Sequence, residues 1–111
     1  MTDARRERIA RNESRFRDLN EALMTSVHGR VARGSDRSGF VCECAISECL
    51  EVVSVPVAKY EEVRRDARHF LVAPGHELPD AEQVIECGDG FLVVEKHPDV
   101  APLVEATDPR S

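Results

Sequence analysis

Two runs of strand-forming residues surround a short polar stretch in the segment Phe40-Val41-Cys42-Glu43-Cys44-Ala45-Ile46-Ser47-Glu48-Cys49-Leu50-Glu51-Val52-Val53-Ser54-Val55. We expect Phe40 to Cys44 to form one strand and residues 45–48 to form a tight turn. Leu50 to Val55 is rich in β-branched residues and is expected to form the return strand. The segment therefore predicts a β-hairpin with cysteines around its turn.

Three of the four cysteines of the chain lie in this hairpin. Cys42 and Cys44 are two residues apart, so in a strand their side chains point to the same face, and the turn can bring Cys49 back across from them. Clustered thiols are typical of metal ligands or of redox pairs, and a structural zinc site takes four ligands. The spacing predicts Cys42, Cys44 and Cys49 as ligands of Zn²⁺ and leaves one ligand to find.

His76 is the preferred fourth ligand because it follows Pro74-Gly75, a turn that fixes the backbone and can aim the ring inward. Its neighbour Glu77 is a candidate acceptor for the second ring N–H, which a metal-bound histidine normally donates to an oxygen. Four other residues stay open as the fourth ligand, with the cysteine as second choice: Cys87, His69, His28 and His97.

The cysteines also allow other interpretations. They can be reduced core residues, since free cysteine is often buried, or a redox pair in a thiol-based sensor. Glu43 and Glu48 argue against the redox interpretation, because nearby negative charge raises a thiol pKa and so reduces the amount of reactive thiolate at neutral pH. A catalytic zinc with Glu77 as base ranks low, and no common catalytic motif occurs. We therefore expect no enzyme, but a zinc-binding structural or protein-interaction module with a regulatory role.

The N-terminal segment predicts a long helix from Asp3 to about His28. Its apolar residues recur at helical spacing and define one expected face: Ile9, Phe16, Leu19, Leu23 and Val27. Arginines alternate with acids along the rest of the helix, and Gly29 is expected to end it. This face can pack on the same chain, on a second copy or on another protein, so a protein partner or self-association is expected through the helix.

The remaining pattern predicts an α+β fold: a long N-terminal helix followed by a small antiparallel sheet with a short packed helix. The short helix is expected from Pro56 to about Arg68. Residues 97–111 contain three prolines and can hold at most a short helix near residues 100–106. Further strands are expected at Phe70–Ala73, Glu82–Cys87 and Phe91–Lys96. We divide the chain into an N-terminal helix (1–30), a flexible connector (31–39), the zinc-site domain (40–97) and a C-terminal tail (98–111).

Charge is distributed unevenly over the 111 residues. Residues 1–37 carry nine arginines and six acids, whereas residues 38–111 carry six basic and fifteen acidic groups. An acidic body repels phosphate, so we do not expect nucleic-acid binding as the main function. A nucleic-acid-associated regulator that uses the arginine-rich helix is the alternative. The first residues lack the apolar stretch of a secretory signal and no run is long enough to span a bilayer. We expect a cytoplasmic protein without membrane contact.

Several segments that together cover most of the chain have a distinctive sequence: residues 40–44 with Cys49, 60–64, 70–77 and 93–96, and Arg11-Asn12-Glu13 in the helix. Through these segments, and most specifically through the three cysteines and Pro74-Gly75-His76-Glu77, the chain resembles a group of small uncharacterised actinobacterial proteins. The resemblance implies a shared fold and a shared site, with no assigned activity. Two features depart from the group, the turn at residues 45–48 and Cys87, and the second departure favours His76 as the fourth ligand.

Overall fold

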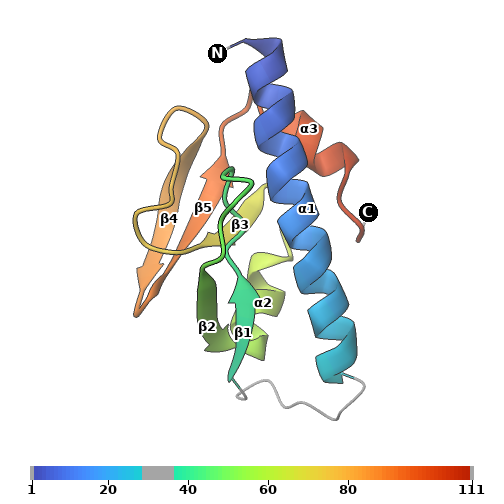
Figure 1. Ribbon diagram of the computed structural model, residues 1–111, viewed down its shortest axis with the longest axis vertical. Coiled ribbons are helices and arrows are strands. Elements are labelled where there is room, and N and C mark those ends of the chain that lie inside the picture. Colours follow the sequence, from blue (N-terminus) through green and yellow to red (C-terminus); the bar gives the residue numbers. More distant parts are fainter. Residues whose placement is uncertain (1, 29–36, 111) are drawn as a thin grey trace.

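The computed structural model describes residues 2–28 and 37–110 and confirms the predicted α+β class. A long helix, α1, runs along the molecule beside the strands, with β1 and α3 in contact with it (Figure 1). The elements follow in the order α1 (Asp3–His28), β1 (Arg37–Val41), β2 (Val52–Pro56), α2 (Val57–Val63), β3 (His69–Val72), β4 (Glu82–Gly88), β5 (Phe91–Lys96) and α3 (Ala101–Ala106).

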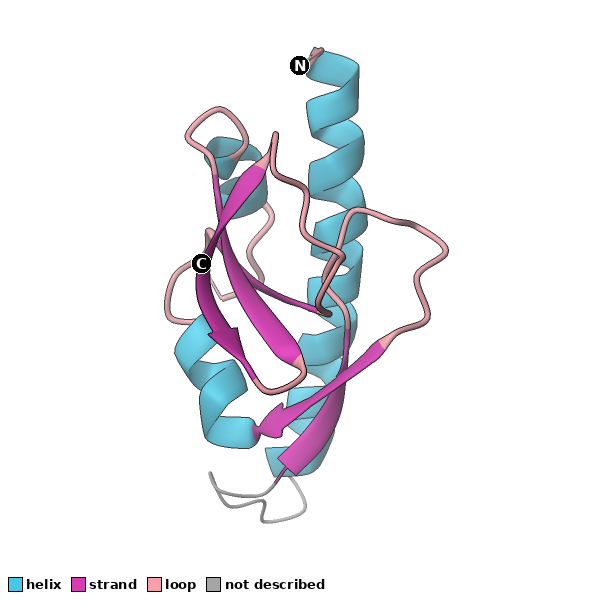
Figure 2. Ribbon diagram, turned by 90° about the vertical axis from the view of Figure 1, so that its left-hand side faces the viewer, coloured by secondary structure: helices cyan, strands magenta, loops and turns pink. Residues whose placement is uncertain are grey.

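The described strands form two antiparallel sheets instead of the single sheet expected. β1 pairs with β2, and β5 lies between β3 and β4 (Figure 2). The first strand was predicted to reach Cys44, but β1 ends at Val41. The reason is that the next amides bond in different directions: Cys42 N donates to Glu51 O at 3.0 Å, whereas Glu43 N donates to Leu71 O at 2.8 Å. The segment after β1 thus joins the hairpin to β3.

Other boundaries also need correction. Most of the predicted connector, residues 31–36, lies outside the described residues, and residues 37–39 belong to β1. The short helix predicted from Pro56 is α2, which starts one residue later and ends at Val63, because Pro56 closes β2. The C-terminal tail contains α3, where Val100 and Val104 are fully buried, so this part of the tail packs on the body.

The core joins the hairpin to the three-stranded sheet. Phe40 of β1 stacks on Tyr60 of α2 with ring centroids 4.4 Å apart, and both side chains are fully buried. Phe70 and its two successors in β3 are also fully buried, as the predicted apolar run suggested. The hydrogen bond from Glu43 N to Leu71 O brings the segment after β1 next to β3, and the segments that follow these two strands carry the candidate site.

The predicted apolar face of α1 is correct at Ile9 and Phe16 but wrong further along. Leu19 is 50% exposed and Leu23 is 39% exposed, whereas Met24 is buried. The side chain of Val27 lies outside the described part of the chain. The helix is therefore turned so that a different set of residues faces the body.

Polar residues occupy much of the buried face of α1. Arg17 is fully buried, donates to the carbonyl oxygens of Ala67 and Val104 at 2.7 Å each, and lies over the Phe70 ring. A buried polar group is costly unless it finds partners. Here loop and helix-end carbonyls supply them, and these partners lie 50 and 87 residues away in sequence, so the local pattern could not indicate them.

A second buried polar contact joins α1 to the three-stranded sheet. Lys96 of β5 forms ion pairs with Glu13 of α1 and with Glu82 of β4, and all three side chains are almost completely buried. Burial raises the pKa of Glu13 to about 8. The carboxyl group of Glu13 therefore keeps its proton at neutral pH.

Candidate metal centre

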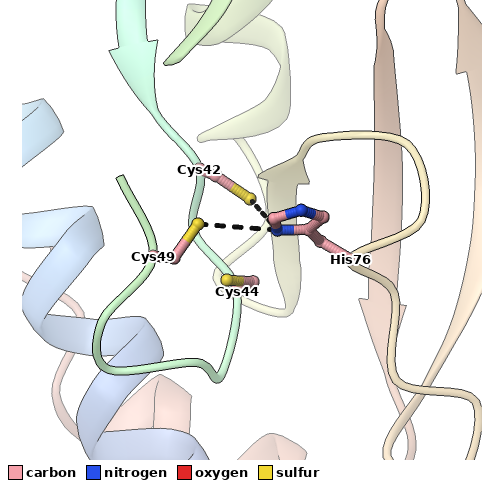
Figure 3. A group of neighbouring side chains, drawn as sticks. All are labelled: Cys42, Cys44, Cys49 and His76. Carbon is pink, nitrogen blue, oxygen red and sulfur yellow. Dashed lines mark hydrogen bonds between the residues drawn. The ribbon is translucent and has the colours of Figure 1, made fainter. Parts of the chain in front are cut away.

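The four predicted ligands come together at one point between the hairpin and the turn after β3 (Figure 3). Cys42 and Cys44 follow β1 directly, Cys49 lies in the segment that returns to β2, and His76 follows the Pro74-Gly75 turn. One ligand atom from each residue lies within 4.8 Å of the others. The arrangement can hold a metal ion.

The distances match those of a tetrahedral thiolate and imidazole site. The Nδ1 atom of His76 lies 3.6 Å from Cys42 Sγ and 3.5 Å from Cys49 Sγ. With zinc–sulfur bonds of about 2.3 Å and zinc–nitrogen bonds of about 2.0 Å, a regular tetrahedron places sulfur and nitrogen about 3.5 Å apart. These two sulfur–nitrogen distances therefore fit a single central ion.

Backbone hydrogen bonds fix the ligands in place. Ala73 N donates to Cys42 Sγ at 3.1 Å, which joins the end of β3 to the first thiol. His76 N donates to Ala73 O at 3.0 Å and closes a turn in which Gly75 has a φ of 89°, a conformation that favours glycine. On the other side, Cys49 N donates to Ile46 O at 3.1 Å. The predicted turn before His76 is therefore present and presents the ring to the thiols.

The thiols differ in their affinity for protons. A hydrogen bond from Cys42 lowers the pKa of Cys44 to about 5, against the effect of burial. The same hydrogen bond, together with burial, raises the pKa of Cys42, and burial raises the pKa of Cys49. At neutral pH the cluster thus carries a thiolate on Cys44 with protons on the other two sulfurs. A metal ion would have to displace those protons to take three thiolates.

Glu43 lies between two of the cysteines but its side chain enters the core. It is fully buried, and its carboxylate accepts hydrogen bonds from Asn20 Nδ2 at 2.8 Å, Tyr60 Oη at 2.6 Å and Leu71 N at 3.0 Å. Burial raises its pKa, while these donors lower it. The expectation that acidic neighbours raise the thiol pKa is wrong for Cys44, whose pKa is lowered. Its carboxylate instead anchors the segment that carries the first two thiols.

The other candidates for the fourth ligand lie elsewhere or are not described. Cys87 is exposed on β4, and His69 is grouped with Asp66 and Glu95, where its Nε2 lies 2.8 Å from Glu95 Oε2. His97 lies outside both groups of possible ligands found in the described residues, and the side chain of His28 falls outside that part of the chain. The predicted acceptor Glu77 makes no recorded bond to the His76 ring, and its Oε1 is buried without a partner among the described residues.

Two residues that support the site were missed. Neither Asn12 nor Asn20 was predicted to support the site, yet Asn20 is fully buried and both side chains bond to the cysteine segment. A signal was available, because Asn20 lies at helical spacing between the buried residues Phe16 and Met24. A polar residue in the middle of a buried helical face indicates a buried partner.

No protein-family model, curated protein or solved structure matches the chain. The resemblance to the actinobacterial group therefore stays a prediction, and support for metal binding comes from the geometry of the site. Within residues 2–28 and 37–110, no helix combines the length and apolar composition needed to cross a bilayer.

Proposed function

We propose that the chain is a non-enzymatic zinc-binding module in which Cys42, Cys44, Cys49 and His76 hold one Zn²⁺. The observation that carries this proposal is the sulfur–nitrogen spacing of 3.5 and 3.6 Å, which is the spacing of a tetrahedral site. Three sulfurs and one imidazole nitrogen form a donor set that suits zinc and is poor for calcium or magnesium, which take oxygen ligands.

A structural role is favoured over a catalytic one. Catalytic zinc sites keep one position for water or substrate, whereas four protein ligands fill a tetrahedron. Cys42 and Cys44 are also almost completely buried, so substrate access from that side is blocked. The ion would tie the hairpin to the turn after β3 and so stabilise a core with only five aromatic residues.

The test is the metal content of protein purified without added metal. Mass spectrometry should find about one equivalent of zinc, and a chelating dye should take it up only after the thiols are blocked or the protein unfolds. Less than about a tenth of an equivalent, together with no binding of added Zn²⁺, would contradict the proposal.

A thiol-based redox sensor is the second candidate, because the three thiols lie within 4.8 Å of one another and Cys49 is partly exposed. In that reaction two thiols would form a disulfide while hydrogen peroxide is reduced to two molecules of water. Mild peroxide should then release zinc and protect two cysteines from alkylation, and a thiol should reverse both changes. If peroxide changes neither the zinc content nor the alkylation of the cysteines, the redox role is excluded.

A protein partner for α1 remains a prediction, as does the alternative of contact with nucleic acid.

A further inference from the structure

Side chains of α1 reach the turn that lies between the proposed ligands. Asn12 Nδ2 donates to Ala45 O at 2.8 Å, and Arg15 Nη2 donates to Ser47 O at 3.1 Å. Both acceptors belong to residues 45–48, the turn between the second and the third cysteine. The position of this turn therefore affects the ligands and the docking of the helix together.

Asn20 makes a third contact, next to the first cysteine. Its side chain accepts a hydrogen bond from Val41 N at 2.8 Å and donates to Val41 O at 2.9 Å and to Glu43 Oε2 at 2.8 Å. One buried side chain thus bonds to the residues on both sides of Cys42. Neither an apolar residue nor water could replace this set of bonds at a buried position without loss.

These contacts lead to an inference that depends on the proposed zinc site. We propose that metal occupancy controls how firmly α1 is docked, and that Asn12, Arg15 and Asn20 are positioning residues for the site although none is a ligand. A bound ion fixes the turn and thereby the acceptors for the helix. Because coupling between two events is reciprocal, a docked helix must in turn strengthen metal binding by the same factor.

Not all contacts of α1 depend on the turn. Glu13 pairs with Lys96, and Arg17 bonds to Ala67 and Val104, all of which lie outside the cysteine segment. Removal of metal should therefore weaken the contacts of α1 with the cysteine segment and affect α1 more than β5. A greater loss of hydrogen-exchange protection in α1 than in β5 distinguishes selective coupling of the helix to the metal site from general unfolding.

The first experiment is hydrogen exchange of the full chain with one equivalent of Zn²⁺ and after its removal by a chelator. We expect removal of zinc to accelerate exchange of the α1 amides about tenfold more than exchange of the β5 amides, within the range typical of coupled sites. Equal acceleration in α1 and β5, or no acceleration in α1, would overturn the inference. If the chain binds no zinc at all, the proposed function fails before this comparison is reached.

The second experiment measures zinc affinity by dye competition in Asn12→Ala, with Arg11→Ala as the matched control. Both residues are on α1, but Arg11 is exposed and makes no recorded hydrogen bond to residues 45–48. We expect Asn12→Ala to weaken zinc binding about fivefold and Arg11→Ala to leave it unchanged. Arg15→Ala, an exposed position that should not impair folding, is expected to act in the same direction as Asn12→Ala. Unchanged affinity in both would refute the coupling even though zinc still binds.

Discussion

The thiol cluster and the cluster of Glu13, Glu82 and Lys96 both bury acidic groups, but only the second contains a lysine or arginine side chain. An unpaired buried anion costs several kcal/mol, so each cluster needs a way to limit its charge. The carboxylate cluster uses the ammonium group of Lys96 and a proton on Glu13. The thiol cluster uses protons on Cys42 and Cys49 and hydrogen bonds to the sulfurs.

This difference indicates where an external cation belongs. In the carboxylate cluster the chain supplies its own cation, and a metal would have to compete with Lys96 there. In the thiol cluster protons and hydrogen bonds limit the charge, and a soft cation can replace the protons with stronger bonds to sulfur. The following predictions test this contrast, beginning with the largest expected effect.

Loss of one buried thiol should remove the metal and most of the stability. In Cys44→Ser we expect no stoichiometric zinc and a loss of at least about 4 kcal/mol, since structural zinc supplies more than that in small domains. For a domain of this size the melting temperature should fall by roughly 15–30 °C. Thermal unfolding by circular dichroism, with metal analysis of the same sample, gives both values.

Cys87→Ser is the matched control for that variant. Cys87 is exposed on β4 and is not among the grouped ligands, so its zinc content and melting temperature should equal those of the wild type. A control that loses zinc, or a Cys44→Ser protein that keeps it, would show that the ligand set is wrongly assigned.

Loss of the internal cation should destabilise the second cluster without any effect on metal content. Lys96→Met leaves ionisable carboxyl groups buried without their partner, and removal of one member of such a pair costs about 3–5 kcal/mol. Lys59→Met is the control, because Lys59 also pairs with a glutamate and lies over an aromatic ring but at a partly exposed position. We expect it to cost at most about 1 kcal/mol. Similar losses in the two variants in urea unfolding would contradict the argument.

The proton on Glu13 predicts a pH dependence. The pKa of Glu13 is about 8 in the folded chain against 4.5 as its ordinary value, so the folded state binds the proton more tightly. Its contribution is fully present below about pH 4.5 and is lost as pH rises through about 8. Urea unfolding should show a loss of roughly 1–3 kcal/mol between pH 5 and pH 8.5 from this group.

Glu13→Gln should remove that slope, because glutamine has no proton to lose. The comparison is made on zinc-loaded samples, so that ionisation of free thiols does not contribute. If the variant keeps the wild-type slope between pH 5 and pH 8.5, the proton belongs to another group of the cluster.

The contrast between the clusters also explains what could be predicted from the sequence. The thiol site depends on close spacing in the cysteine segment and on one turn before His76, and both are local features. By contrast, Glu13 lies 83 residues from Lys96, and isolated charged residues are normally assigned to the surface. No local pattern distinguishes a buried ion pair from an exposed one.

The end of β1 and the buried face of α1 were predicted wrongly for the same reason: both depend on polar partners that are distant in the sequence. β1 stops before Cys42 because Glu43 bonds to β3, a partner that lies about 28 residues further on. α1 buries Arg17 and Asn20 and leaves Leu19 exposed because distant carbonyl and carboxylate groups face the helix. Periodicity measures apolar content and cannot detect such partners.

The smallest effect is expected from the residue that the apolar pattern placed wrongly. Because polar contacts and the buried apolar residues hold α1, Leu19→Ala at a half-exposed position should change the free energy of unfolding by less than about 0.5 kcal/mol. Met24→Ala, five residues along the same helix and 2% exposed, should cost about 2 kcal/mol or more. Urea unfolding at pH 6 with zinc bound compares the two. A large loss in Leu19→Ala would mean that the exposed side of α1 is covered in solution, and size-exclusion chromatography with light scattering would then show whether a second copy covers it.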